Sequence, residues 1–385
     1  MRIMAISHPC VTDVNQQFYA ELEALGHTVQ LIVPSNFRTT YSADTVEVSR
    51  WPDFAGMIEQ RKVGLSGSIP LHYYQSNLRP SIKAFRPDVL FVEEEPYSAS
   101  AWQAFYASRD LPMKRVVYSA QNILKQYPLP FRWMERYVLD RTDLAAVVSS
   151  EVGEVLRKKN FQGGLLSFPL GVDTGQFRPM LEERRKLRRE LEADEKFIVG
   201  YVGRFVEEKG IRFLLEAAEK LAGHPVSFVF VGKGELLEDI RRVQARHPGL
   251  IRILDSVKHN DVHRWMNAMD ALALPSLTMP NWKEQFGRVI VEAMACGVPV
   301  IGSDSGQIPV LLRETGGGWI VPERDAEALA AVIRSLMEQP GERDRCAEAG
   351  LAAVSRTYSK KGLAKAFEQA LMKGQPEEQS GRAAL

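Results

Sequence analysis

The chain has 385 residues, of which 49 are basic and 48 acidic, so its formal net charge at neutral pH is +1. This balance gives no general attraction to nucleic acid, and the length is sufficient for two domains with separate cores. Three widely spaced cysteines argue against a disulfide scaffold and fit a reducing compartment. Since the sequence has neither a signal-peptide pattern nor an apolar run of about 18 residues, we expect a soluble, cytoplasmic α/β enzyme.

The first half alternates short apolar runs with amphipathic segments, as successive βα units do. Strands are expected at 2–6, 27–33, 88–92, 115–119 and 145–149. Helices are expected at 18–25, 131–140 and 150–159. The turn-rich stretch PLGVDTGQFRP then predicts a boundary between a first domain, 1–175, and a second, 176–360.

The second half repeats the pattern after a highly charged helix at 181–191. Strands are expected at 197–202, 226–231, 251–254, 271–274 and 298–302. Two such series predict an α/β protein of two doubly wound, Rossmann-like domains that face one another. A last helix, 361–372, is expected to return to the first domain, and 373–385 to be disordered.

One stretch of the second half, EQFGRVIVEAMACGVP at 284–299, is expected to organise the functional site. It predicts a short buried helix that begins near Phe286–Arg288 and ends at Gly297. The free N–H groups of its first turn would form an anion site. Glu284 lies just before this helix and Glu292 lies inside it, where a carboxylate needs a partner. This layout suits a ligand with hydroxyl groups at both ends and phosphates between them.

Two loops after predicted strands of the second domain carry further candidates. The first contains Arg204 and Lys209, whose charges suit phosphate oxygens, although Lys209 alone is equally consistent with a solvated charge. The second reads Gly232-Lys233-Gly234-Glu235, which is a poor dinucleotide fingerprint because it lacks the third glycine. A tight turn is the simpler interpretation of this second loop.

Together these motifs resemble the family-4 retaining glycosyltransferases, which have the GT-B fold with two Rossmann-like domains on a central cleft. The resemblance rests on the order and spacing of motifs through most of the second half. Those motifs are Gly203-Arg204 with Lys209-Gly210, Pro275-Ser276, Glu284-x7-Glu292 and the run ACGVPV. It implies that the second domain binds a nucleotide-diphosphate sugar, most often a UDP-sugar, and that the first binds the acceptor.

The resemblance also implies roles for individual residues. Arg204 and Lys209 would neutralise the donor diphosphate, and Glu284 would bind hydroxyls of the donor sugar. Glu292 would hold the ribose, with a structural cap partner as its alternative role. Further donor-binding positions would be Gln285, Phe286, Gly287, Arg288, Val257 in the segment 255–257, and Asp13.

No metal is expected at this site, because the sequence contains no Asp-x-Asp pair and no His, Cys or carboxylate cluster with ligand spacing. Two cations and a helix N-terminus can replace Mg²⁺ as the counter-charge of a diphosphate. The resemblance implies transfer with retention of configuration and no cofactor beyond the donor. The leaving phosphate would assist deprotonation of the acceptor.

The first domain departs from the family pattern at two loops. Its first loop, which starts with His8 and includes Asp13, lacks the usual glycine pair, so backbone approach to phosphate should be restricted. The usual histidine after strand 115–119 is replaced by Gln121 and Asn122, whose amides cannot act as a base at neutral pH. His8, Gln121 and Asn122 are therefore candidates for the donor-sugar or acceptor side, with a structural role equally open for His8.

Two other features of the first domain allow two interpretations. The acids Glu93, Glu94 and Glu95 follow a predicted strand and are either acceptor-binding carboxylates, with Glu95 preferred, or a solvated loop. Trp133 between Arg132 and Arg136 fits a helix on a membrane surface, or more simply an amphipathic helix packed on the core. At most peripheral contact with the inner face of the membrane is expected.

The resulting hypothesis is sugar transfer to a carbohydrate, lipid-linked or small-molecule acceptor, in polysaccharide, glycolipid or glycoconjugate synthesis. A non-catalytic nucleotide-sugar-binding module is the alternative, in which the altered first loop no longer supports transfer. A nicotinamide oxidoreductase with tandem Rossmann domains is disfavoured, because the first βα turn has no GxGxxG.

Overall fold

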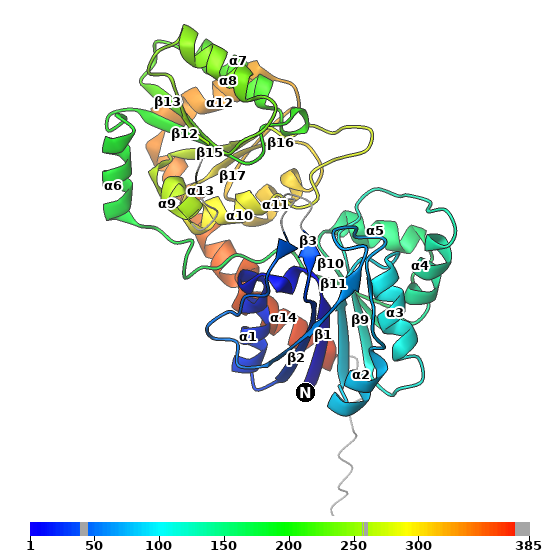
Figure 1. Ribbon diagram of the computed structural model, residues 1–385. Helices are drawn as coiled ribbons and strands as arrows, with labels where there is room; N and C mark the ends of the chain where they lie inside the picture. The colour runs from blue at the N-terminus through cyan, green and yellow to red at the C-terminus, as the bar shows by residue number, and fades with distance from the viewer. Residues whose placement is uncertain (39–44, 256, 258–260, 374–385) are drawn as a thin grey trace, which may run out of the picture. The chain divides into compact units, whose positions relative to one another are not determined.

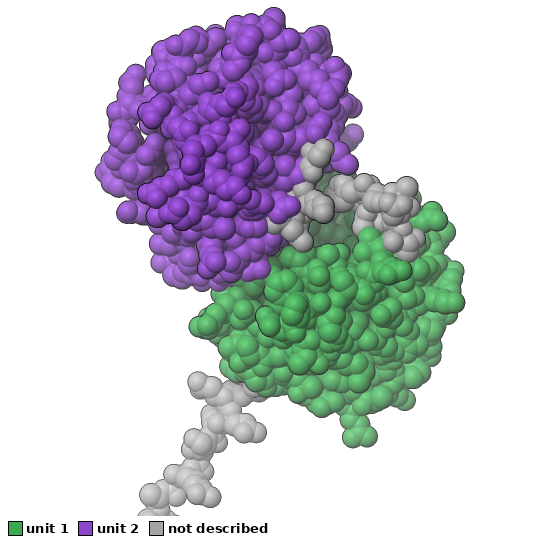
Figure 2. All heavy atoms as spheres, turned by 60° about the vertical axis from the view of Figure 1, so that its left-hand side comes forward, with its two compact units in different colours: residues 1–168, 360–385 green, residues 169–359 purple. Residues whose placement is uncertain are grey.

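The structure is a computed structural model that describes residues 1–38, 45–255, 257 and 261–373. The chain divides into two compact units (Figure 2). Unit 1 comprises Met1–Phe168 with Lys360–Leu385, and unit 2 comprises Pro169–Ser359. Among the described residues, no helix combines the length and the apolar character needed to cross a membrane.

Unit 1 is built on a seven-stranded parallel sheet with the order β11-β10-β9-β8-β1-β2-β5 (Figure 1). Its strands are β1 Arg2–Ser7, β2 Thr28–Pro34, β5 Met57–Arg61, β8 Val89–Glu93, β9 Lys114–Ser119, β10 Leu144–Val147 and β11 Gly164–Ser167. Its helices are α1 Gln17–Ala24, α2 Arg79–Phe85, α3 Ala99–Ala107, α4 Phe131–Leu139, α5 Ser150–Lys158 and α14 Lys360–Met372. The central strands are continuous apolar runs because helices cover both sheet faces. Two short hairpins complete it, β3 Phe37–Arg38 with β4 Thr45–Val46, and β6 Val63–Gly64 with β7 Tyr73–Tyr74.

Unit 2 is built on a six-stranded parallel sheet with the order β14-β13-β12-β15-β16-β17. Its strands are β12 Phe197–Val202, β13 Val226–Val231, β14 Ile251–Leu254, β15 Ala271–Leu274, β16 Val300–Ser303 and β17 Gly318–Val321. Its helices are α6 Leu181–Glu190, α7 Ile211–Lys220, α8 Leu237–Arg246, α9 Val262–Ala268, α10 Arg288–Ala295, α11 Ile308–Thr315, α12 Ala326–Glu338 and α13 Pro340–Ala353. A π-helical turn, Val354–Tyr358, leads out of the unit.

The two sheets share one winding rule that fixes where a ligand can bind. In each unit the chain builds the sheet outward from its first strand to one edge, then returns to the other side. The reversal places a topological switch point between β1 and β8 in unit 1, and between β12 and β15 in unit 2. In doubly wound sheets, ligands bind beyond the carboxyl ends of the strands at this point.

The predicted fold class, two doubly wound parallel α/β domains, is confirmed. Strand 298–302 begins two residues late, at Val300, because Gly297 takes a left-handed conformation (φ +73°) and the chain turns there. In the two large sheets, the strands that the sequence did not indicate are β5, β11 and β17, each an edge strand of its sheet. Their residues are mostly half-buried or exposed, so they lack the continuous apolar run of a central strand.

The unit boundary lies after Phe168 rather than at the predicted residue 175. The segment that follows belongs to unit 2 because its backbone is bound there: the Val172 N–H donates to the Tyr358 carbonyl (2.9 Å). At the other end of the chain, α14 packs on α1 of unit 1, with the rings of Phe18 and Phe367 5.5 Å apart. The predicted disordered tail lies outside the described residues beyond Lys373.

Candidate functional site

The switch point of unit 2 begins with the loop after β12, which places Lys209 over the end of β15. Lys209 closes a 3-10 turn, Glu207–Lys209, and Gly210 follows in a left-handed conformation (φ +67°). A Cβ atom at position 210 would lie 1.8 Å from the Pro275 carbonyl oxygen. Glycine is therefore required for this loop to approach the next strand end.

Lys209 and Glu284 form a largely buried ion pair at this point. The Lys209 Nζ lies 2.6 Å from the Glu284 Oε2, and the Ser276 hydroxyl donates to the same oxygen over 3.1 Å. The ammonium also lies 4.6 Å from the centroid of the Trp282 ring. The loop after β12 and the loop between β15 and α10 thus meet at one carboxylate, which has little freedom to reorient.

The backbone around Glu284 is fixed as firmly as its side chain. Its carbonyl accepts from the Gln307 N–H over 3.1 Å. A Cβ at Gly306, which has φ +52°, would lie 2.2 Å from the same carbonyl oxygen. The loop before α11 therefore packs directly against the backbone of Glu284 and holds its position.

Helix α10 begins where the sequence predicted, and no side chain of the described residues caps its N-terminus. Gly287 is the N-cap residue, with φ +79°, and Phe286 before it is buried, 6.0 Å from the ring of Tyr358. The N–H groups of the first turn are the donors that an anion would use. The described geometry therefore offers a helix N-terminus next to the Lys209–Glu284 pair.

The structure gives Arg288 a function that the sequence did not indicate. Its Nε lies 2.8 Å from Oε1 of Glu292, one turn along α10, and Glu292 is buried. An ion pair is the partner that a buried carboxylate needs. The Arg288 side chain thus neutralises Glu292, whereas the sequence predicted a role only for the Arg288 backbone N–H, facing a ligand.

Arg204 lies on the same loop as Lys209 but outside the buried cluster. Its guanidinium is exposed and lies 3.2 Å from the Glu208 carboxylate, while the Tyr201 hydroxyl donates to the Arg204 carbonyl over 2.7 Å. Gln285 is exposed and Val257 half-buried, and neither contributes to the Lys209–Glu284 cluster in the described contacts. Residue 256, which belongs to the predicted base-binding segment, lies outside the described residues.

The glycine-rich loop after β13 acts as a packing turn. Cβ atoms at Gly232 and Gly234 would lie 2.0 Å from the Gly203 carbonyl oxygen and 2.4 Å from that of Phe205. Both glycines have positive φ, and the Phe205 N–H donates to the Lys233 carbonyl over 2.9 Å. The turn interpretation therefore explains GKGE, since its glycines allow two loops to pack together.

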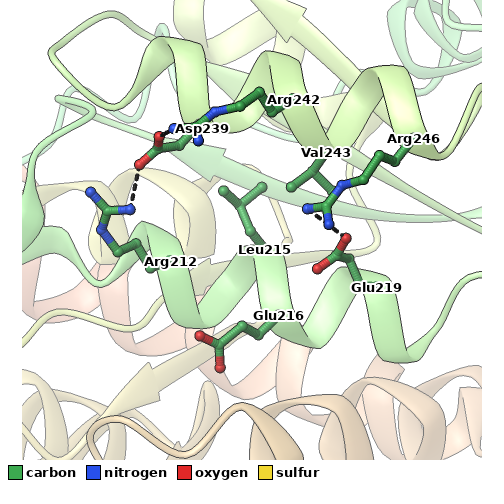
Figure 3. Close-up of a pocket in the computed structure, with 8 residues that line it drawn as sticks. All are labelled: Arg212, Leu215, Glu216, Glu219, Asp239, Arg242, Val243 and Arg246. Atoms are coloured by element: carbon green, nitrogen blue, oxygen red, sulfur yellow. Dashed lines mark hydrogen bonds and ion pairs between the residues drawn. The ribbon is translucent and has the colours of Figure 1, made fainter.

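A hollow between α7 and α8 illustrates a site that lacks this organisation (Figure 3). Its arginines are each matched by an acid, as the pairs Arg212 with Asp239 and Arg246 with Glu219 show. Because the charges cancel within the hollow and the residues are surface ion pairs, this site has little to offer a charged ligand.

The switch point of unit 1 holds a second cluster, formed by His8, His72 and Glu94. Glu94 is buried, and its Oε2 lies 2.7 Å from the His8 Nδ1 and 3.4 Å from the His72 Nε2. Its Oε1 accepts from the His8 N–H over 2.9 Å. Although burial opposes ionisation, the two imidazoles hold the pKa of Glu94 at about 2. Burial lowers the pKa of His72, but the Glu94 carboxylate outweighs it, so the pKa of His72 is raised.

These three residues also form a group that could ligate a metal, with one ligand atom from each lying within 4.8 Å of the others. The sequence showed no such cluster, because the fold joins residues 8, 72 and 94 from three separate segments. His72 had no signal in the sequence, since it lies in a turn-rich stretch between short strands. His8 was a candidate, and the structure connects it to two partners that the sequence did not predict.

The other two acids after β8 are not a solvated loop, which corrects one of the two interpretations offered by the sequence. The Glu93 carboxylate accepts from the Ser7 hydroxyl (2.6 Å) and from Tyr19 (2.9 Å). Glu95 accepts from the Ser119 hydroxyl (2.9 Å) and the Ala120 N–H (2.8 Å). Burial raises the pKa of Glu93, and it raises that of Glu95 to about 7.

The remaining candidates of unit 1 make local contacts. The Gln121 side chain donates to the Ile123 carbonyl over 3.0 Å, and Asn122 is buried, with its amide 3.4 Å from Glu151. Asp13 accepts from the N–H of the next residue over 2.7 Å. None of these three joins the His8–Glu94 cluster through a described contact.

Comparison with known proteins connects this architecture to sugar transfer. Residues 183–352 match the family model described as "Glycosyl transferases group 1". An amylovoran biosynthesis glycosyltransferase, AmsK of Erwinia amylovora, is 31% identical over 37% of this chain and 36% of its own length. An alpha-D-kanosaminyltransferase of Streptomyces kanamyceticus is 25% identical over 68% of this chain and 71% of its own length.

The fold comparison extends over both units. HepE from Anabaena, solved in complex with UDP, has a TM-score of 0.70 at 17% identity and covers 97% of this chain and 100% of its own. The same protein has also been solved with UDP-glucose. The match with AmsK spans only about a third of that relative's length. The family match therefore lies within the second unit, whereas the fold match covers both units. The chain therefore has the GT-B fold, and its residues 183–352 match the model of the glycosyl transferases group 1 family.

Proposed function

We propose that the protein is a retaining glycosyltransferase that moves a sugar from a nucleotide-diphosphate sugar to an acceptor hydroxyl. The observation that carries the proposal is the Lys209–Glu284 pair beside the uncapped N-terminus of α10. An ammonium and free N–H groups suit a diphosphate, and a fixed carboxylate suits sugar hydroxyls. The names of the relatives support a role in polysaccharide or glycoconjugate synthesis.

In this proposal the chain supplies the counter-charge of the leaving diphosphate without a divalent metal. Lys209 and Arg204 lie on one loop, and the exposed Arg204 guanidinium is free to turn from Glu208 toward a phosphate. Charge grows on the diphosphate as the sugar leaves, so these groups stabilise the transition state more than the ground state. Glu292 holds the ribose, with Arg288 fixing its orientation.

UDP is the favoured carrier, and thermal unfolding tests it directly. We would measure the melting temperature with UDP, GDP, ADP and TDP, each with and without Mg²⁺. Ligand at about a hundred times its dissociation constant adds roughly 2.7 kcal/mol of stability. A shift with one nucleotide in the absence of metal supports the donor site and names the base, whereas no shift with any nucleotide removes the proposal.

Variants then test the assignment of residues. Arg204→Ala and Glu284→Ala should each lower turnover or donor affinity at least about tenfold, or roughly 1.4 kcal/mol. Arg212→Ala is a matched control, because Arg212 is a half-exposed, ion-paired arginine in the hollow of Figure 3. Loss of activity in the control, or unchanged activity in both site variants, would contradict the assignment.

A non-catalytic nucleotide-sugar-binding module is the second candidate. The observation that favours it is the first loop of unit 1, which lacks glycines, together with the burial of Asn122. Such a module would bind the donor as tightly in the same titration. It would leave the donor intact with every acceptor offered, which distinguishes it from a transferase.

A further inference from the structure

Unit 1 contains a hollow of about 570 Å³ whose lining includes five basic side chains. It lies between α4, the end of α5 and the loop that precedes α4. The cations that line it are Lys125, Arg132, Arg136, Lys158 and Lys159, against the single carboxylate of Glu135. Five cations against one acid give this hollow a strongly positive potential, in contrast to the balanced hollow of Figure 3.

Three of these cations have no counter-ion within the described part of the chain. Glu135 is occupied by Lys159, whose Nζ lies 2.5 Å from its carboxylate, and Arg136 lies 2.9 Å from Asp140. The side chains of Lys125, Arg132 and Lys158 have no ion pair or hydrogen bond to any described residue. Guanidinium and ammonium groups that converge without a partner are suited to phosphate oxygens.

The other flank of α4 carries a cluster of neighbouring aromatic rings, which we call the aromatic array. It consists of Trp102 and Tyr106 on α3 with Trp133 and Tyr137 on α4, two helices that lie side by side (Figure 1). Each helix contributes residues four positions apart, which share one face. The ring centroids of Trp102 and Trp133 are 5.7 Å apart, and those of Trp133 and Tyr137 are also 5.7 Å apart.

Arginines flank the aromatic array, and exposed apolar side chains accompany it. Arg109 lies over the Tyr106 ring at 4.2 Å and Arg141 over the Tyr137 ring at 3.8 Å. Trp133 is 51% exposed, and Leu129, in the loop before α4, is 76% exposed. Exposed apolar side chains that gather in one region mark an interaction surface, and tryptophan and tyrosine in particular suit a lipid–water interface.

We propose that unit 1 binds an anionic phospholipid bilayer through α4, with lipid phosphates in the basic hollow and the aromatic array at the interface. Arg132 and Trp133 are adjacent on α4, so the basic hollow and the aromatic array lie on neighbouring flanks of one helix. A free phosphate or a phosphorylated small molecule would use the hollow but would leave the array unexplained. Amphipathic aromatic and basic side chains together are the combination that binds membrane surfaces.

The test is binding of the full chain to vesicles in a sedimentation assay, and it needs neither donor nor acceptor. Vesicles of phosphatidylcholine alone would be compared with vesicles that contain about one third phosphatidylglycerol, in about 0.1 M salt. We expect binding only to the anionic vesicles. The triple variant Lys125→Ala/Arg132→Ala/Lys158→Ala should lower the partition coefficient about a hundredfold, since each cation contributes about fivefold near such a surface.

A matched control removes the same charge elsewhere. The variant Arg185→Ala/Lys186→Ala/Arg189→Ala changes three exposed cations of α6, in unit 2, and should bind as the parent does. Trp133→Ala should weaken binding about tenfold, because burial of an aromatic ring at the interface is lost. All variants should melt at the parent temperature, since the substituted side chains are mostly exposed.

Three outcomes would overturn the proposal. In the first, the parent chain does not bind anionic vesicles. In the second, the α6 control variant loses as much binding as the triple variant. In the third, inorganic phosphate or glycerol phosphate would raise the melting temperature of the parent and not of the triple variant, while vesicles bind neither. That result would assign the hollow to a soluble anion. The proposed sugar transfer would stand or fall separately, because the melting test with nucleotides does not involve this surface.

Discussion

Replacement of Lys209 by methionine separates two roles of this side chain, one observed in the structure and one proposed. Its ammonium neutralises Glu284 at 2.6 Å, and we propose that it also contacts the donor diphosphate. Both side chains are largely buried, with 16% of Lys209 and 10% of Glu284 exposed. Any loss of donor binding in Lys209→Met could therefore come from a displaced Glu284 rather than from a missing phosphate contact.

The expected loss of stability follows from the burial of the pair. Removal of one partner of a fully buried ion pair costs about 3–5 kcal/mol. Here the pair is partly exposed and Glu284 keeps the Ser276 hydroxyl at 3.1 Å. We therefore expect Lys209→Met to lower the free energy of unfolding of unit 2 by about 2–3 kcal/mol. In the double variant Lys209→Met/Glu284→Gln the uncompensated charge is gone, and we expect about 2 kcal/mol of this loss to be recovered.

Urea unfolding and nucleotide titration of the same four proteins complete the cycle. Lys209→Met should lower affinity for the nucleoside diphosphate at least about tenfold, and the double variant should not regain it. Glu284→Gln alone should keep most of the affinity for the nucleoside diphosphate, since that ligand lacks the sugar. If the double variant recovers both stability and affinity, Lys209 is only the counter-ion of Glu284 and the phosphate assignment is refuted.

Three further predictions concern stability and loop geometry. Asp270→Ala should lower the free energy of unfolding by about 3 kcal/mol in urea titrations, because two arginines of α6 lie within 2.9 Å of this buried carboxylate. Burial lowers the pKa of His27, so below about pH 6.5 the unfolded state binds more protons than the folded state and the free energy of unfolding falls. His27→Gln should therefore flatten that part of the curve of unfolding free energy against pH. Gly210→Ala should abolish nucleotide binding and lower the melting temperature, whereas Gly223→Ala, also at positive φ but with no atom within 4 Å of the new Cβ, should cost only about 1 kcal/mol and leave binding intact.

The sequence predicted unit 2 better than unit 1 for a physical reason. Its candidate site residues Arg204, Lys209 and Glu284 lie in loops that follow continuous apolar strands, so their places beyond the strand ends could be predicted directly. The pairing of Lys209 with Glu284 could not, because it depends on how closely the loop at Gly210 approaches Pro275. Periodicity locates elements along the chain, but it carries no information on the distance between two loops.

In unit 1, one member of the His8–Glu94 cluster, His72, has no pattern in the sequence that predicts its position. His72 reaches Glu94 from a turn between short strands, and only the tertiary fold brings it within 3.4 Å. The acids after β8 look like a solvated loop in sequence, because a run of charges usually is one. Their burial follows from hydroxyl and N–H donors such as Ser7 and Ser119, which lie at the ends of neighbouring strands.

The two switch points share one construction despite their different residues. In each, a largely buried glutamate is held by a basic side chain from a loop after the first strand: Lys209 for Glu284, and His8 for Glu94. A basic group bound in this way is oriented before any ligand arrives, which limits the reorganisation that binding requires. The difference lies in what the basic group can do next. A lysine ammonium suits a phosphate, whereas a histidine with one ring nitrogen against a carboxylate can offer its other ring nitrogen to a hydroxyl group. Under the proposed function, Lys209 would bind the anionic donor in unit 2 and His8 would bind a hydroxyl-bearing acceptor in unit 1, so each ligand would lie at the switch point of its own unit.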